Sequence, residues 1–96
     1  MHLYINGRKV SPVHDATLSP GKMHFETLHM PGGHVERHPV RKDPDQVAFT
    51  LPRDVLLRPD DLTAEHALAD ETQVMHIAIL QVNFVKRGSR VLANVD

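Results

Sequence analysis

The chain has no cysteine and no tryptophan, and one tyrosine and three phenylalanines are its only aromatic residues. Without cysteine there can be no disulfide bond, no thiolate metal ligand and no cysteine nucleophile. This absence agrees with a reducing cytoplasm, where we expect the protein, although many periplasmic proteins also lack cysteine. Because aromatic rings are so few, the core must be built mainly from aliphatic side chains.

Long apolar segments and an excess of one charge are also missing. The longest nearly apolar run, residues 74–85, is interrupted by three polar side chains and is too short to cross a bilayer as a helix. The first residues do not place an apolar run after a basic one, so we expect no signal peptide. The net charge of −1 gives no overall attraction to nucleic acid or to an acidic membrane. These features indicate a soluble protein that does not bind membranes.

Turn residues divide the rest of the sequence into short segments. Asn6-Gly7 and Pro31-Gly32-Gly33 are typical of tight hairpin turns, and a further turn is expected near Gly88. The hydrophobic fraction of 41% and the charged fraction of 24% are ordinary for a globular domain. We predict one domain, residues 1–96, with an α+β fold of about six or seven mostly antiparallel, hairpin-connected strands and one short helix.

The helix is expected around residues 60–71, packed on the sheet. Acidic residues after Pro59 suit the start of a helix, and Ala64, Ala67 and Leu68 would share one side of it. Its apolar stripe is short, so it should depend on docking for its stability.

Two other segments read clearly as strands. Residues 46–51 alternate apolar and small or polar side chains, which is typical of a half-buried strand. Residues 73–86 form the strongest predicted strand. Its first half is so apolar that we expect it to be central and covered on both faces.

Histidine is the one residue type that is unusually concentrated. Four of the eight histidines lie between residues 24 and 38, together with two glutamates. His34, Glu36 and His38 alternate along one predicted strand, so their side chains should project from the same face, about 6.8 Å apart in sequence order. Imidazole and carboxylate groups are ligands of zinc and similar divalent metals, which need three or four of them at one point. Such a cluster would also gain positive charge as the pH falls toward about 6.

The partner strand's contribution depends on the hairpin turn. A tight turn centred on Pro31-Gly32 pairs Glu26 with Arg37, a chemically matched pair that favours this register, whereas a three-residue turn pairs Glu26 with His38. The first register gives four candidate metal ligands: His34, Glu36, His38 and His29. The second gathers His24, Glu26, His34, Glu36 and His38 on one face.

No arrangement of residues in the sequence is typical of an active site. The serines lie in turn contexts, and no glycine-rich loop precedes a helix to hold a phosphate. We therefore interpret the chain as a non-catalytic binding or adaptor domain that recognises another protein through a sheet edge or surface, with a homodimer as one expected form and no required cofactor. The alternative is a zinc-type metal-binding protein that uses the hairpin of residues 24–38. A weaker alternative is nucleic-acid contact through basic loop tips near Arg8, Arg41 and Lys86.

Overall fold

The computed structural model describes residues 1–96 and consists mainly of antiparallel strands. The nine strands are β1 (His2–Ile5), β2 (Arg8–Pro12), β3 (His14–Ser19), β4 (Met23–His29), β5 (Val35–Lys42), β6 (Gln46–Pro52), β7 (His66–Ala69), β8 (Val74–Val85) and β9 (Gly88–Val95). Two short helical turns complete the structure: η1 (Pro31–Gly33) and α1 (Pro59–Leu62). The predicted antiparallel, hairpin-rich character is confirmed. There are more strands than expected, in part because residues 66–69, where a helix was predicted, form β7.

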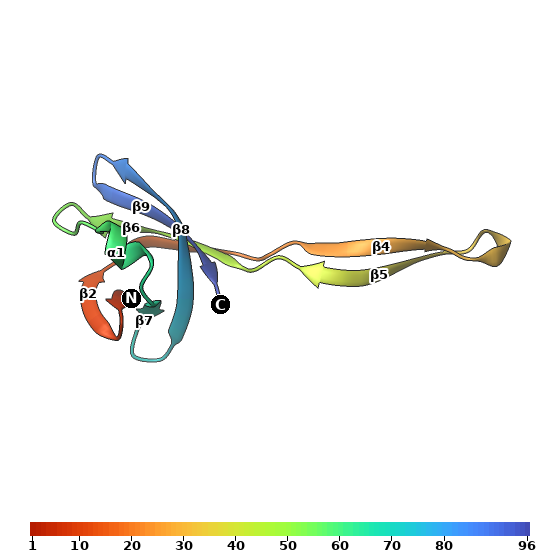
Figure 1. Ribbon diagram of the computed structural model, residues 1–96, viewed down its shortest axis with the longest axis horizontal. Coiled ribbons are helices and arrows are strands. Elements are labelled where there is room, and N and C mark those ends of the chain that lie inside the picture. Colours follow the sequence, from red (N-terminus) through yellow and green to blue (C-terminus); the bar gives the residue numbers. More distant parts are fainter.

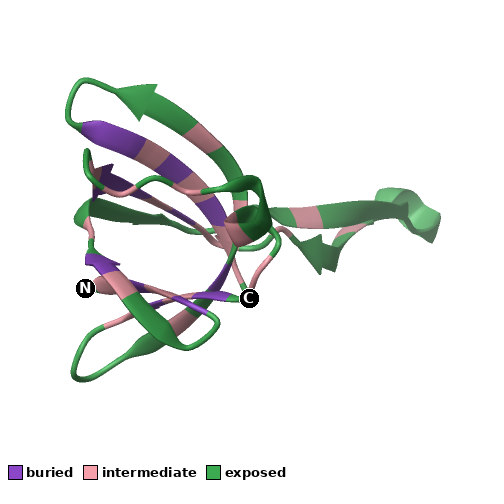
Figure 2. Cartoon of the chain, turned by 60° about the vertical axis from the view of Figure 1, so that its left-hand side comes forward, coloured by how far each residue is buried: buried purple, intermediate pink, exposed green.

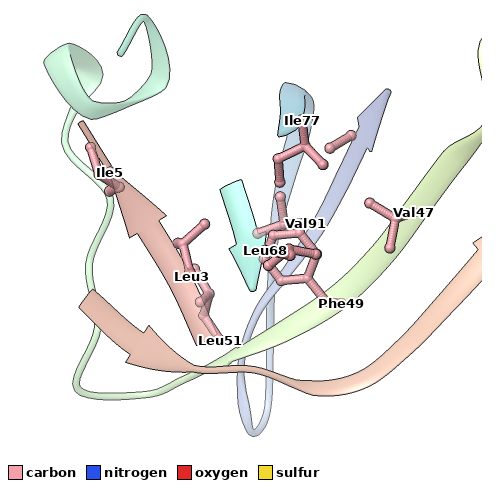
Figure 3. Packing of buried hydrophobic residues seen from close by; sticks show 9 residues of the cluster. Leu3, Ile5, Val47, Phe49, Leu51, Leu68, Ile77 and Val91 are labelled. Carbon is pink, nitrogen blue, oxygen red and sulfur yellow. The ribbon is translucent and has the colours of Figure 1, made fainter. Parts of the chain in front are cut away.

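Seven strands form one sheet in the order β2-β1-β7-β8-β9-β6-β3, which we call the body together with its loops (residues 1–19 and 46–96). The sheet curls until its edge strand β2 contacts β6 near the opposite edge. Its inner face encloses the core drawn in Figure 3. The core consists of nine hydrophobic residues: Leu3, Ile5, Val47, Phe49, Leu51, Leu68, Ile77, Val91 and Ala93.

Strand β6 shows why these residues lie inside. Val47, Phe49 and Leu51 are spaced by two, so their side chains all project to the inner face, as the alternation predicted. Phe49 is fully buried and is the largest side chain at the centre of the core. Burial of apolar surface on one face thus fixes the register of β6 against its neighbour β9.

The predicted helix at residues 60–71 is wrong for most of its length. Helix α1 has four residues, and the segment after it forms β7, which pairs with β1 on one side and β8 on the other. His66 and Leu68 are buried, whereas Ala67 and Ala69 are only half-buried. This period of two suits a strand, and pairing on both sides overrides the helix propensity of the alanines.

Strand β8 lies inside the sheet, between β7 and β9, as expected, but only its inner face is covered. Ile77 is buried, whereas Val74 is 64% exposed and Leu80 is 52% exposed. No helix lies over the outer face of this strand, because the segment predicted to supply one is itself part of the sheet. The expectation that both faces would be covered is therefore wrong.

Strands β4 and β5 form a separate two-stranded sheet that projects from the body (Figure 1). The molecule measures 64 × 29 × 24 Å, and its radius of gyration is 18.1 Å, against about 12.5 Å for a compact domain of this length. Figure 2 shows the buried residues gathered in the body alone. None of the helical segments has the length and apolar content that crossing a lipid bilayer would require.

Candidate functional site

The projecting hairpin, which we call the arm (residues 23–42), is the most unusual part of the structure. β4 and β5 pair only with each other, so both outer edges carry backbone N–H and C=O groups without a strand partner. The arm continues the pairing of β3 with β6, so residues 14–52 form one long hairpin whose inner half belongs to the body. No residue of the arm is buried.

The register of the arm is the one that the sequence did not favour. Glu26 lies opposite His38 and Thr27 lies opposite Arg37. The turn contains the three residues of η1, with Gly32 and Gly33 both at positive φ, and Met30 N–H donates to the His34 carbonyl across it. Two adjacent glycines supply the left-handed conformations that the longer turn requires.

One face of the arm carries most of the predicted metal ligands. Glu36 lies between two imidazole rings: its Oε2 is 2.9 Å from His38 Nε2, and its Oε1 is 3.4 Å from His34 Nε2. Leu28 pairs with Glu36, so Leu28 and Glu26 face the same way as these side chains. We call this side the histidine face. All three metal-ligand candidates on β5 and the preceding turn are substantially solvent-exposed.

His29 does not join this cluster. It pairs with Val35, and alternation along β4 places it on the opposite face of the arm. As arranged, no three histidine, aspartate or glutamate side chains form a group that could hold a metal ion.

The opposite side, which we call the apolar face, was not identified in the sequence. It carries Met23, Phe25, Val35 and Pro39, interspersed with Thr27, His29 and Arg37. Three of the apolar residues are large side chains between 41% and 51% exposed. The Arg37 guanidinium lies over the Phe25 ring at 4.6 Å from its centroid. This cation–π contact holds a charged and an aromatic side chain together on an exposed surface. The period of two within residues 23–39 could have revealed this face.

Two aspartates hold the arm where it leaves the body. Asp45 Oδ1 accepts a 2.7 Å hydrogen bond from the Gly21 amide, and the Lys42 ammonium lies 3.4 Å from the same oxygen. The Gly21 bond first and the lysine second lower the pKa of Asp45. Asp43 Oδ2 lies 2.9 Å from His24 Nε2, and this hydrogen bond is the main cause of the lowered pKa of Asp43. These contacts hold together the two chain segments at the root of the arm.

The body has a groove on the outer side of β1, β7 and β8, with a volume of about 390 Å³. Its apolar lining comes mainly from Tyr4, Ala67, Ala69 and Val74, and its acidic residues are Glu65 and Asp70; Gly7, His66 and His76 complete it. Tyr4, Ala67 and His76 are paired across the three strands, which puts them on the same face of the sheet.

Asp70 is held as an anion at this groove. The backbone N–H of Thr72, the Thr72 hydroxyl and the Gln73 N–H all donate to its carboxylate at 2.8 to 2.9 Å. These bonds lower the pKa of Asp70, led by the Thr72 amide. The groove therefore combines an apolar lining with fixed negative charge at neutral pH.

The basic loop tips do not gather in one place. Figure 1 shows the β1–β2 turn, the β8–β9 turn and the arm at three separate extremities of the molecule. Two arginines near these tips already have partners: Arg90 donates to the Asp15 carbonyl and to Thr50 Oγ1, and Arg37 stacks on Phe25.

Comparison of the chain with protein-family models, with curated proteins and with solved structures found no match.

Proposed function

We propose that the protein is a non-catalytic binding module that recognises another protein through its arm, and that a homodimer is the first form of association to test. The observation that carries this proposal is the apolar face of the arm. Met23, Phe25 and Val35 are exposed on one side of a two-stranded ribbon that packs against no other element. Exposure of this apolar surface to water is unfavourable in an isolated monomer. Exposed apolar surface of this kind is typical of interaction sites.

The exposed area supports the same conclusion. A compact monomer of 10.8 kDa is expected to expose about 5,500 Å², whereas this chain exposes 6988 Å². The excess, about 1,500 Å², is larger than the roughly 800 Å² that each partner contributes to an interface of standard size. A partner that covers the arm would therefore remove a large part of this excess.

The energetics of an isolated hairpin point in the same direction. A two-stranded ribbon is marginally stable in water, since backbone pairing alone offsets little of the conformational entropy lost on ordering. The arm extends well beyond the contacts at its root, and its strand edges are open to another chain. Docking of the apolar face, with or without strand addition, would stabilise it.

The test uses a photo-reactive amino acid placed on each face of the arm. A probe at Phe25 reports on the apolar face, and a probe at Leu28 is the matched control on the histidine face, because both residues lie on β4 with similar exposure. After irradiation in cells that produce the protein, we expect the Phe25 probe to give one discrete protein adduct, identified by mass spectrometry. Equal or diffuse labelling from both positions would contradict the proposal.

A second candidate function, divalent-metal binding, is favoured by the position of Glu36 between His34 and His38. A metal ion of the zinc type would take the place of the contacts within this trio and would need a further ligand. Zinc titration of chelator-stripped protein, followed by histidine-ring NMR, tests this function. Saturable one-to-one shifts lost in the double variant His34→Ala, His38→Ala would support it. Weak shifts spread over all eight histidines would contradict it.

A further inference from the structure

The arm and the body carry opposite charge. The arm (residues 23–42) contains three basic side chains (Arg37, Arg41 and Lys42) and two acidic ones (Glu26 and Glu36), so its formal charge is +1. The body (residues 1–19 and 46–96) contains seven basic and eight acidic side chains, so its formal charge is −1. The net charges of the two regions therefore do not oppose the approach of a second copy.

The same complementarity exists between two particular surfaces. On the apolar face of the arm, the Phe25 ring and the Arg37 guanidinium form one stacked unit. The groove of the body offers an apolar lining for the ring, and Glu65 and Asp70 as carboxylate partners for the guanidinium. Arginine suits such a site because its planar group pairs with carboxylates and stacks on aromatic rings at once.

The groove also adjoins the part of the sheet that is apolar but uncovered. Val74 lines the groove and is 64% exposed, and Ala78 follows on the same outer face of β8. The sequence of β8 has the composition of a strand covered on both faces, whereas the isolated chain covers one. An incoming apolar surface would supply the missing cover.

The arm cannot fill the groove of its own chain. It leaves the body from β3 and β6, at one end of the sheet order, whereas the groove lies on β1, β7 and β8. Figure 1 shows the arm pointing directly away from these strands. Any contact between the two surfaces must therefore join different molecules.

We propose that the apolar face of the arm of one copy docks in the groove of a second copy, with Phe25 against the apolar lining and Arg37 beside Glu65 and Asp70. This inference rests on the proposed function, because it names the partner that the arm recognises. The occupant is a second copy of this chain, chosen because Arg37 on the arm and the carboxylates of the groove carry complementary charge.

A charge exchange tests the pairing in the purified protein. Arg37→Glu and Glu65→Arg should each weaken self-association, measured by sedimentation over a concentration series, by about tenfold or more. The double variant carries the exchanged pair on every copy and should recover most of the loss. Arg41→Glu is the matched control: it changes the same charge on the arm, but Arg41 pairs with His24, on the face of the arm opposite Phe25 and Arg37. It should have a much smaller effect. All three residues are exposed, so circular dichroism should show an unchanged fold.

Engineered cysteines provide a second, independent readout, because the natural chain has none. Thr27→Cys, which lies opposite Arg37 and two residues from Phe25 on the apolar face, mixed with Val74→Cys at the groove, should form an intermolecular disulfide under mild oxidation. Leu28→Cys, on the histidine face, should react far less with the same partner. Equal yields from both pairs, or a chain that stays monomeric at every concentration, would overturn the inference.

The two proposals fail in different ways. If the purified chain stays monomeric while the Phe25 photo-probe labels one unrelated protein, the groove is not the partner surface, but the binding function of the arm stands. If the chain does not self-associate and the probe gives no discrete adduct, both proposals fall.

Discussion

The body and the arm are built from the same antiparallel pairing, yet they differ in what holds them together. In the body, β6 buries Val47, Phe49 and Leu51 under a curled sheet. The arm continues the same long hairpin outward, and none of its residues is buried. Backbone hydrogen bonds are present in both regions, so the difference lies in burial of apolar surface, the dominant favourable term in folding. The body supplies that burial itself, whereas the arm leaves its apolar surface exposed.

The largest expected effect comes from making the same change in both regions. Phe49→Ala removes the largest buried side chain of the core and should lower the free energy of unfolding by about 3–5 kcal/mol. Phe25→Ala removes a half-exposed ring and its contact with Arg37. It should lower the free energy of unfolding of the isolated chain by less than about 1 kcal/mol.

Urea denaturation monitored by circular dichroism compares the two variants. In the proposed assembly the Phe25 change should instead appear as weakened association in sedimentation experiments. Similar losses of stability for the isolated Phe25→Ala and Phe49→Ala chains would show that the arm is part of the cooperative fold. That result would contradict the claim that only the body is held together by buried apolar surface.

A substitution at the junction between the two regions should destabilise the chain more than a substitution in the arm itself. A Cβ atom at Gly21 would clash with the Asp43 carbonyl oxygen, so the segment between β3 and β4 and the segment between β5 and β6 must move apart in the Gly21→Ala variant. We expect the free energy of unfolding to fall by about 1–3 kcal/mol. We also expect the direction of the arm to change, which small-angle X-ray scattering would detect as an altered maximum dimension. An unchanged scattering profile with unchanged amide shifts around Asp45 would show that the close contact does not set the direction of the arm.

Lowering the pH should have a smaller effect on the stability of the junction. The pKa of Asp45 is lowered in the folded chain, so its ionised form is favoured by folding. Its contribution is therefore fully present above the ordinary carboxyl pKa of about 4 and is lost as the pH falls through the lower folded value. NMR of the Gly21 amide between neutral and acid pH should follow this titration, and in Asp45→Asn the transition should be absent. A Gly21 amide that titrates equally in both proteins would contradict the proposed hydrogen bond.

The sequence predicted the elements whose pattern is local. The alternation in β6, the Asn6-Gly7 hairpin and the turn at Pro31 to Gly33 all lie where they were expected. The helix predicted at residues 60–71 failed because β7 is stabilised by pairing with β1 and β8, which lie far from each other in the chain. The prediction that the outer face of β8 would be covered failed for the same reason. Whether a helix lies over this face depends on long-range packing.

The candidate site was predictable only in part. The common face of His34, Glu36 and His38 follows from strand geometry and appears in the structure, whereas the position of His29 depended on a register that the sequence misjudged. Favourable pairing of Glu26 with Arg37 counted for less than the backbone geometry of two adjacent glycines. The metal function itself stays a prediction. The groove joins residues 4–7 to residues 65–76, so no local pattern could have revealed it.

Residue-resolved hydrogen exchange of the intact chain, at low and at high protein concentration, tests the central claim most directly. We predict that the amides of β6 and β9 exchange slowly and equally at both concentrations, because the body is self-sufficient. The paired amides of β4 and β5 should exchange quickly in dilute solution and become protected at high concentration, together with amides around the groove. Arm amides protected as strongly as those of β6 in the dilute monomer would contradict the account.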